Sequence, residues 1–310
     1  MKKIKNYLLT GATGFIGFNI LNKLKKQKRT RIYYVYRDKN LRLKNEKLTG
    51  IKINFENLKE IDKLKNILGK IDTVIHCANL AHSKHSSSMI KKVNYSATIH
   101  LAKLAKKFKI KKFIFLSTAK INMDYNKNIN CETDISPNIK NDVYTKFKYQ
   151  TEKSIEKILK NSKVNYFILR PALVYGNNVK GNLKKLTMLI DLNLPLPFLN
   201  TINKKSFCSI NNLIKCIDCI LINNFKSNTF IICDNTYYSI KDIVIYLSKL
   251  KNKKIILFPI KIFLFKIFFI LINSKDKFDS IFSRMILDNS KIKKKFNIDF
   301  QNNFYNTKYK

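Results

Sequence analysis

The first half of the chain alternates between short apolar runs and segments with helical periodicity. Apolar runs of strand length occur at residues 4–9, 32–36, 51–55, 72–78 and 112–116. Apolar positions spaced three to four residues apart follow them, at 16–24, 58–68 and 90–108. Strands that alternate with helices in this way build a parallel sheet that helices cover on both faces. We therefore predict a doubly wound α/β fold.

The second half is less regular. A sixth strand is predicted at 164–169, and the run Leu194-Pro195-Leu196-Pro197 predicts a loop or turn. Later patterns predict helices and a strand, at 212–222, 229–233 and 240–250. We therefore expect a first domain over residues 1–170 and a smaller lobe over 171–310, with some of its elements returning to the sheet.

One apolar stretch, residues 255–272, raises the question of a membrane. Pro259, Lys261 and Lys266 interrupt it, and it is short for a spanning helix that carries charges. The sequence therefore predicts no transmembrane segment. A buried or interfacial helix is expected, with peripheral membrane contact as the alternative.

Three glycines stand where the first strand meets the first helix, in Gly11-Ala12-Thr13-Gly14-Phe15-Ile16-Gly17. Glycine allows a tight turn and a close backbone approach, and a helix N-terminus offers free N–H groups and a positive dipole end. A dinucleotide pyrophosphate needs this context. The predicted cofactor-binding residues here are Gly11, Thr13, Gly14, Phe15, Ile16 and Gly17.

The formal net charge of +41 leaves two interpretations open. A nucleic-acid or membrane partner would explain it, but the basic residues are overwhelmingly Lys and are scattered through every segment. Asn and Ile are also abundant, and all three have AT-rich codons. We therefore favour compositional bias, expect no specific nucleic-acid partner, and keep a basic nucleic-acid-binding protein as an alternative.

The pattern of the six cysteines bears on whether the protein works in a reducing or an oxidising compartment. Cys216 and Cys219 form a C-x-x-C inside an apolar helical run, without a second pair at zinc spacing. Thiols of this kind fit the core of a protein in a reducing cytoplasm. No set of His, Cys and carboxylate residues has metal-ligand spacing, so no metal is predicted.

The second strand ends in Tyr36-Arg37-Asp38. In a doubly wound fold the residue at this tip faces the adenosine ribose of a dinucleotide. An acid there would bind the ribose hydroxyls of NAD, whereas Arg37 would pair with the 2′-phosphate of NADP. Asp38 stands one position further on, so the sequence favours NADP over NAD only slightly.

Three residues form a candidate catalytic set. Thr118 follows the fifth strand, and Tyr144 and Lys148 are four residues apart in a helical pattern, which places both on one helix face. An unperturbed phenol is a poor acid or base at neutral pH, and a neighbouring ammonium is expected to lower its pKa. The Thr118 hydroxyl could hydrogen-bond the reacting oxygen.

Together these motifs resemble the extended short-chain dehydrogenase/reductases of the NAD-dependent epimerase/dehydratase family, over essentially the whole length. The resemblance implies a Rossmann-like NAD(P)-binding domain, with Thr118, Tyr144 and Lys148 as catalytic residues. It also places further residues at the cofactor: Asn57 and Leu58 beside the adenine, Ala78 of the strand-four motif, and Tyr144, Lys148 and Pro171.

Later motifs resemble one branch of that family, the UDP-sugar 4-epimerases and the C4 ketoreductases of surface-polysaccharide synthesis. The resemblance implies a UDP-sugar substrate held by the second lobe and a homodimer. The implied substrate contacts are Thr118, Asn182 and Lys205, the last usually an Arg in relatives. His82 is a further candidate contact, because it follows the carboxyl end of the fourth strand.

One departure separates the two activities of this branch. Galactose epimerases typically show Arg-Tyr-Phe-Asn after strand six, where this chain reads Arg170-Pro171-Ala172-Leu173. The substrate-contacting Asn is therefore missing. This favours an NAD(P)-dependent reduction of a UDP-4-keto-6-deoxy-hexosamine, with 4-epimerisation and a non-catalytic cofactor-binding protein as alternatives.

Overall fold

The structure of the protein is a computed structural model. It describes residues 4–38, 45–80, 85–122, 128–129, 135, 139, 142–176, 179, 182–201, 203–271, 278, 282 and 284–300. The chain divides into two compact units. Unit 1 comprises 1–121, 135–171 and 213–230, and unit 2 comprises 122–134, 172–212 and 231–310. The assignment of cofactor binding to one domain and substrate binding to the other stays a prediction.

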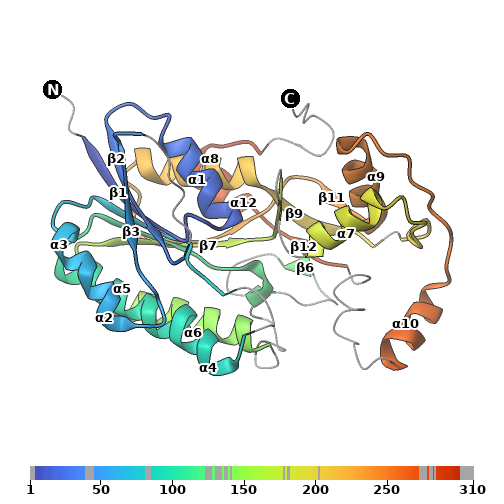
Figure 1. Ribbon diagram of the computed structural model, residues 1–310, viewed down its shortest axis with the longest axis horizontal. Coiled ribbons are helices and arrows are strands. Elements are labelled where there is room, and N and C mark those ends of the chain that lie inside the picture. The colour runs from blue at the N-terminus through green and yellow to red at the C-terminus, as the bar shows by residue number, and fades with distance from the viewer. Residues whose placement is uncertain are drawn as a thin grey trace. The chain divides into compact units, whose positions relative to one another are not determined.

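Within the described residues a seven-stranded sheet has the order β10-β7-β5-β4-β1-β2-β3 (Figure 1). Its strands are β1 (Lys5–Thr10), β2 (Thr30–Tyr36), β3 (Leu48–Lys52), β4 (Thr73–His76), β5 (Lys112–Leu116), β7 (Asn165–Pro171) and β10 (Asn228–Ile232). Neighbours from β3 to β7 pair in parallel. Chain order runs outward from β1 in both directions, so the doubly wound α/β fold is confirmed.

One strand differs from its predicted position. The apolar pattern placed it at 51–55, whereas β3 spans Leu48–Lys52 and pairs with β2 from Ile32↔Leu48 to Tyr36↔Lys52. Ile53 and Phe55 are buried, but they lie in the connection that follows β3. The apolar run therefore marked a packed connection, and the strand itself sits at the partly exposed sheet edge.

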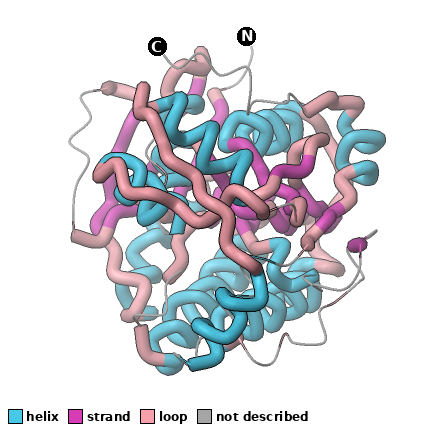
Figure 2. Tube along the Cα trace, turned by 90° about the vertical axis from the view of Figure 1, so that its right-hand side faces the viewer, coloured by secondary structure: helices cyan, strands magenta, loops and turns pink. Residues whose placement is uncertain are grey.

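Helices cover both faces of this sheet (Figure 1). On one face lie α1 (Phe15–Leu24) and α8 (Ile210–Ile222). The other face carries α2 (Leu58–Ile61), η1 (Asp62–Leu64), α3 (Lys65–Leu68), α5 (Ala97–Lys107) and α6 (Val143–Leu159). The strands therefore run between helices (Figure 2), and their apolar character on both faces follows from this burial.

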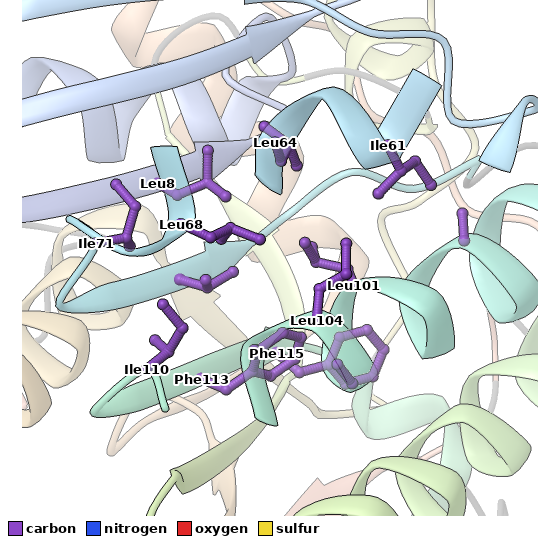
Figure 3. Close-up of a cluster of buried hydrophobic side chains, with 14 of the residues drawn as sticks. Leu8, Ile61, Leu64, Leu68, Ile71, Leu101, Leu104, Ile110, Phe113 and Phe115 are labelled. Atoms are coloured by element: carbon purple, nitrogen blue, oxygen red, sulfur yellow. The ribbon is translucent and has the colours of Figure 1, made fainter. Parts of the chain in front are cut away.

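A hydrophobic cluster fills the space between the sheet and the second set of helices (Figure 3). Leu8 and Phe113 come from strands, and Leu64 and Leu101 come from helices; all four are fully buried. Burial of an aliphatic or aromatic side chain contributes about 1.5–3 kcal/mol, so this layer holds the strand ends in fixed positions.

The predicted helix over 90–108 is interrupted. It divides into α4 (Ser87–Ile90), a π-helical turn η2 (Lys91–Ser96) and α5. The carbonyl oxygen of Asn94 in η2 accepts hydrogen bonds from the hydroxyls of Thr98 and Thr151, at 3.0 and 3.1 Å. These side-chain donors satisfy a carbonyl that a π-turn leaves out of the regular α-helical ladder.

Unit 2 is built of smaller elements. Strands β8 (Leu173–Tyr175), β9 (Lys205–Ser209) and β11 (Tyr237–Tyr238) form one sheet, and β6 (Asn128–Ile129) and β12 (Ile286–Leu287) form another. The remaining elements are η3 (Ala119–Asn122), within which the chain passes from unit 1 to unit 2, and α7 (Asn182–Asp191), α9 (Ile240–Leu250), α10 (Ile262–Leu271) and α12 (Ser290–Phe296). Buried Asp234 ties this unit together, because it accepts hydrogen bonds from Tyr175, the Ser209 backbone and Asn212.

The apolar stretch at 255–272 contains α10, which is not a buried helix. Phe263, Ile270 and Leu271 are 57%, 54% and 78% exposed. Of the predicted buried or interfacial helix, the buried form is therefore wrong, because only part of the circumference of α10 finds partners among the described residues of its unit, and the interfacial form stays a prediction. Among the described residues no helix has the length and apolar character needed to cross a membrane.

A buried ion pair joins α6 to the ends of two neighbouring strands. The Glu152 carboxylate accepts from Arg170 Nε at 3.1 Å and from its Nη2 at 2.5 Å, and the Ser117 hydroxyl donates to the same carboxylate. Ser117 follows β5 and Arg170 lies in β7, while Glu152 is on α6. All three are buried, so the carboxylate charge is balanced inside the protein.

We expect Glu152→Ala to lower the free energy of unfolding by about 3–5 kcal/mol, because it leaves the Arg170 charge buried without its partner. The control is Glu156→Ala on the same helix, whose exposed pair with Lys153 should be worth less than about 1 kcal/mol. Urea unfolding measures both. Equal losses in the two variants would contradict a structural role for the buried pair.

Candidate functional site

In the glycine turn at residues 11–17, backbone atoms pack so closely that side chains would not fit at two of the glycines. Gly11 has φ +69°, and a Cβ there would lie 2.6 Å from the backbone N of Ala78. A Cβ on Gly17 would lie 2.2 Å from the carbonyl oxygen of Gly11. Both positions therefore exclude side chains, and the turn packs directly against the end of β4. Thr13 is exposed, and Phe15 and Ile16 are half-buried at the start of α1.

The N-terminus of α1 is suited to an anion. Gly14 is its N-cap residue, and no side chain caps the first-turn N–H groups. Helix N-termini with such donors carry a partial positive charge that favours phosphate groups. The tight glycine turn and the N–H groups beside it fit the pyrophosphate of a dinucleotide.

Hydrogen bonds fix the ends of β1 and β4 beside this turn. The Thr10 hydroxyl lies 2.7 Å from His76 Nδ1 and accepts from the Ala78 backbone N–H at 3.2 Å. His76 Nε2 lies 2.8 Å from the Thr98 hydroxyl, so both ring nitrogens have partners. Burial lowers the pKa of His76 to about 3, and the imidazole is therefore a neutral core group.

The tip of β2 carries opposite charges. Arg37 Nε donates to Asp38 Oδ2 at 2.7 Å, and Arg37 Nη1 lies 3.6 Å from Glu56 Oε1. The guanidinium thus already has two carboxylate neighbours. Nearby, Asn57 is the N-cap of α2, with its Oδ1 accepting from Lys59 N at 3.0 Å, and Leu58 is exposed.

Tyr144 reaches the end of β4. It lies in the first turn of α6, which Asp142 caps through a hydrogen bond to the Tyr144 N–H. The phenol oxygen accepts from Asn79 Nδ2 at 3.3 Å, and Asn79 Oδ1 is buried without a partner among the described residues. Burial raises the pKa of Tyr144 to about 12, so the phenol keeps its proton at neutral pH.

Lys148 points from the same helix face to the end of β5. Its ammonium donates to the carbonyl oxygen of Leu116 at 2.7 Å and lies 4.4 Å from the centre of the Phe115 ring. Burial lowers the pKa of Lys148 to about 7. Thr118 follows two residues after Leu116 and is half-buried. Its hydroxyl accepts from the Lys120 N–H at 3.3 Å.

The expectation that Lys148 lowers the pKa of Tyr144 is not met in this arrangement. Lys148 is turned toward the Leu116 carbonyl, while the phenol is paired with Asn79. Desolvation is then the largest influence on both groups, and it raises one pKa and lowers the other. Each group is consequently shifted toward its neutral form.

Residues of unit 1 thus converge at the carboxyl ends of β1, β4 and β5. The chain brings together there an anion cradle, a protonated phenol, an amine and a hydroxyl. Pro171 ends β7 of the same sheet and is buried. In a doubly wound sheet this edge is where ligands bind, and a phenol beside an amine can move a proton to or from a carbonyl or hydroxyl.

The other predicted substrate contacts are not among the described residues of unit 1. His82 falls outside the described residues. Asn182 begins α7, but its side chain is also outside the description, and Lys205 begins β9, where it pairs with Tyr238 of β11. Asn182 and Lys205 both belong to unit 2.

Sequence reasoning missed Asn79. It comes three residues after β4, a position where the fold places ligand-facing groups, so its place behind the strand was the available signal. Asn94 holds the segment after Asn79, because its side-chain amide makes two hydrogen bonds to the backbone of Leu80, at 2.8 and 3.0 Å. The position of Asn79 could suggest a role, but no sequence pattern predicts the partners of Asn79 or Asn94.

Comparison with known proteins agrees with this geometry. A model of the NAD dependent epimerase/dehydratase family matches residues 7–233. A UDP-glucose 4-epimerase from Vibrio cholerae is 30% identical over 300 residues, which cover 94% of this chain and 90% of the relative.

Solved structures share the fold. A UDP-glucuronic acid 4-epimerase from Bacillus cereus, in complex with NAD, superposes with a TM-score of 0.76 at 20% identity, covering 96% of this chain and 94% of that one. A UDP-glucose 4-epimerase from Thermotoga maritima, with UDP-glucose, gives 0.73 at 20% identity, covering 96% and 94%.

The shifted pKa of Lys148 predicts a pH-dependent stability. Between pH 7 and about 10 the unfolded chain keeps a proton on this lysine that the folded protein releases, so folding becomes more favourable as pH rises. Relative to Lys148→Met, the free energy of unfolding of the wild type should rise by roughly 1 kcal/mol per pH unit.

Urea unfolding at several pH values in this window checks the prediction. Lys146→Met, an exposed lysine on the same helix, is the control and should follow the wild type at every pH. A difference between wild type and Lys148→Met that stays constant across the window would show that Lys148 remains charged.

Proposed function

We propose that this chain, which belongs to the NAD dependent epimerase/dehydratase family, is an enzyme that reduces a UDP-linked 4-keto-6-deoxy-hexosamine at C4. One observation carries the proposal: Tyr144 and Lys148 lie on one face of α6, and each hydrogen-bonds a group at the end of a different central strand. The glycine turn packs against one of these strand ends, so acid–base groups and an anion cradle share one sheet edge.

The cofactor would be held by residues of unit 1. Gly11 and Gly17 allow the turn to close tightly, because a Cβ at either position would meet backbone atoms, and the first turn of α1 would donate N–H groups to the pyrophosphate. Lys148 would hold the nicotinamide ribose, as the family resemblance implies. When bound, a reduced nicotinamide supplies the hydride that a carbonyl carbon accepts.

Tyr144 would donate a proton to the C4 oxygen as the carbon is reduced. A pKa raised to about 12 keeps the phenol protonated at neutral pH, which suits a proton donor. Lys148 would stabilise the phenolate left behind, and Thr118 would orient the carbonyl by donating a hydrogen bond. Lys205 could meet the diphosphate of a UDP-sugar as a point charge.

A 4-epimerase is the second candidate. The Vibrio cholerae relative is described as a UDP-glucose 4-epimerase and matches nearly the whole chain. An epimerase would use the same residues first to oxidise C4 and then to reduce it on the other face. The sequence Arg170-Pro171-Ala172-Leu173 after β7, which lacks the Asn typical of galactose epimerases, favours the reductase.

The choice of cofactor depends on Arg37. The sequence slightly favours NADP, but Asp38 and Glu56 already surround the guanidinium and would repel a 2′-phosphate. The same carboxylates could accept hydrogen bonds from ribose hydroxyls. We therefore propose NAD as the working cofactor, in keeping with the NAD found in the Bacillus cereus structure.

The test supplies the purified protein with a UDP-4-keto-6-deoxy-N-acetylhexosamine and NADH, and follows the loss of absorbance of NADH. Wild type should consume NADH, and Tyr144→Phe should lower kcat by at least about 100-fold because the proton donor is gone. NADH affinity of Tyr144→Phe, measured by fluorescence, should stay within about threefold, because the glycine cradle is unchanged.

Interconversion of UDP-glucose and UDP-galactose without added NADH, combined with no consumption of NADH, would refute the reductase and support the epimerase. Phe147 is a neighbour on the same helix, so Phe147→Leu serves as the control and should keep turnover within about tenfold. Full activity of Tyr144→Phe in either assay would refute the acid–base assignment.

Neutralising the carboxylates around Arg37 should change the cofactor preference. We expect the double variant Asp38→Asn/Glu56→Gln to bind NADPH about tenfold more tightly than wild type, because the guanidinium is then free to meet the 2′-phosphate. NADH affinity should be equal or weaker. Titration with both reduced cofactors measures this, and an unchanged ratio of affinities would place the adenosine ribose elsewhere.

A further inference from the structure

One side of α10 is apolar and uncovered. Its exposed side chains, 44–78% accessible, are Phe263, Leu264, Ile267, Ile270 and Leu271, which we call the apolar face of α10. Their spacing of three to four residues places them on one side of the helix. Figure 1 draws this helix in orange, within the C-terminal third of the chain.

The other side of α10 is already occupied. The Phe265 ring lies 4.9 Å from that of Phe282, and the Phe269 ring lies 6.2 Å from that of Phe278. These contacts anchor the helix to its own unit and orient the apolar face away from it. The exposure is therefore a consequence of the ring contacts that hold the opposite side of α10.

Two lysines accompany this face. Lys261 precedes the first turn and Lys266 lies within α10, and both are exposed. Residues 251–282, which include the aromatic partners of α10, contain seven lysines and two aspartates, so the segment is strongly basic. Apolar side chains beside lysines match the two layers of an anionic bilayer surface, acyl chains below and phosphate headgroups above.

We propose that the apolar face of α10 docks this protein on an anionic lipid surface. Phenylalanine and aliphatic side chains would enter the headgroup–acyl boundary, and Lys261 and Lys266 would reach phosphates, because long lysine side chains extend their ammonium groups into the polar layer. The formal net charge of +41 would draw the whole chain toward the same surface.

A second copy of the chain fits this face less well. In a two-fold contact the same patch meets itself, so Lys261 and Lys266 would meet the partner's lysines, and α10 itself contains no acidic residue to offset them. Like charges at a contact oppose association, and the anionic surface removes that opposition. Helix α10 has 10 residues, so it would lie in the surface layer rather than span it.

Flotation of the full-length protein with vesicles tests the proposal. One vesicle is phosphatidylcholine alone, and the other is an equimolar mixture of phosphatidylcholine and phosphatidylglycerol. We expect binding to the mixed vesicles and little to the neutral ones. Phe263→Gln/Ile267→Gln should weaken binding by about tenfold or more per side chain. Lys261→Gln/Lys266→Gln should weaken it about fivefold per lysine.

Matched controls change the same residue types elsewhere. Leu192→Gln/Ile222→Gln removes apolar side chains that are 67% and 70% exposed, and Lys106→Gln/Lys107→Gln removes two exposed lysines of α5. Both should bind like wild type within about twofold. Circular dichroism and NADH binding verify that each variant is folded.

Three outcomes would overturn the proposal. Equal losses in the controls would show that net charge or general exposure causes the binding. Equal binding to both vesicles would remove the role of the anionic headgroup. Absence of vesicle binding would exclude the membrane as the partner of this face. If, in addition, Phe263→Gln/Ile267→Gln converted a dimer to a monomer in sedimentation, the face would be assigned to a second copy of the chain.

Discussion

The arrangement of the site depends on one buried charge. Glu152 carries a carboxylate into the interior of unit 1, where desolvation is costly unless hydrogen bonds and an opposite charge compensate. Arg170 and Ser117 supply that compensation from β7 and from the end of β5. Because Glu152 lies one turn after Lys148 and two turns after Tyr144, fixing its position also fixes the height and rotation of both residues on α6.

The same low-dielectric surroundings set the protonation states at the strand ends. A half-buried phenol and a buried amine lie there, and each has its pKa shifted toward the neutral form. The amine is held by a backbone carbonyl rather than by the phenol. A negative charge that develops at the carbonyl of a substrate would therefore meet a protonated phenol first, and the lysine could recharge only as that negative charge appears.

The sequence was informative where a local rule determines the structure. The strand at Lys112–Leu116 lies where its apolar run predicted, the glycines form the expected turn, and the spacing of Tyr144 and Lys148 places them on one helix face. Tertiary contacts could not be predicted from the sequence. The Asn79–Tyr144 hydrogen bond and the pairing of Glu152 with Arg170 join residues 65 and 18 positions apart. The direction of the Tyr144 pKa shift depends on desolvation, which no spacing rule reports.

Burial, rather than composition, distinguishes the roles of the many lysines. Lys112 and Lys148 are buried, and each donates to backbone carbonyls: Lys148 to the end of β5, and Lys112 to the carbonyls of Ile220 and Asn223 at the end of α8. The hydrogen bonds of these two lysines stabilise the interior of the protein. Lysines such as Lys261 and Lys266 are exposed, so their charge acts outward, and its effect depends on what lies beside them. Next to apolar side chains such a charge favours binding to a surface that is both apolar and anionic, whereas carboxylates beside it would neutralise it locally.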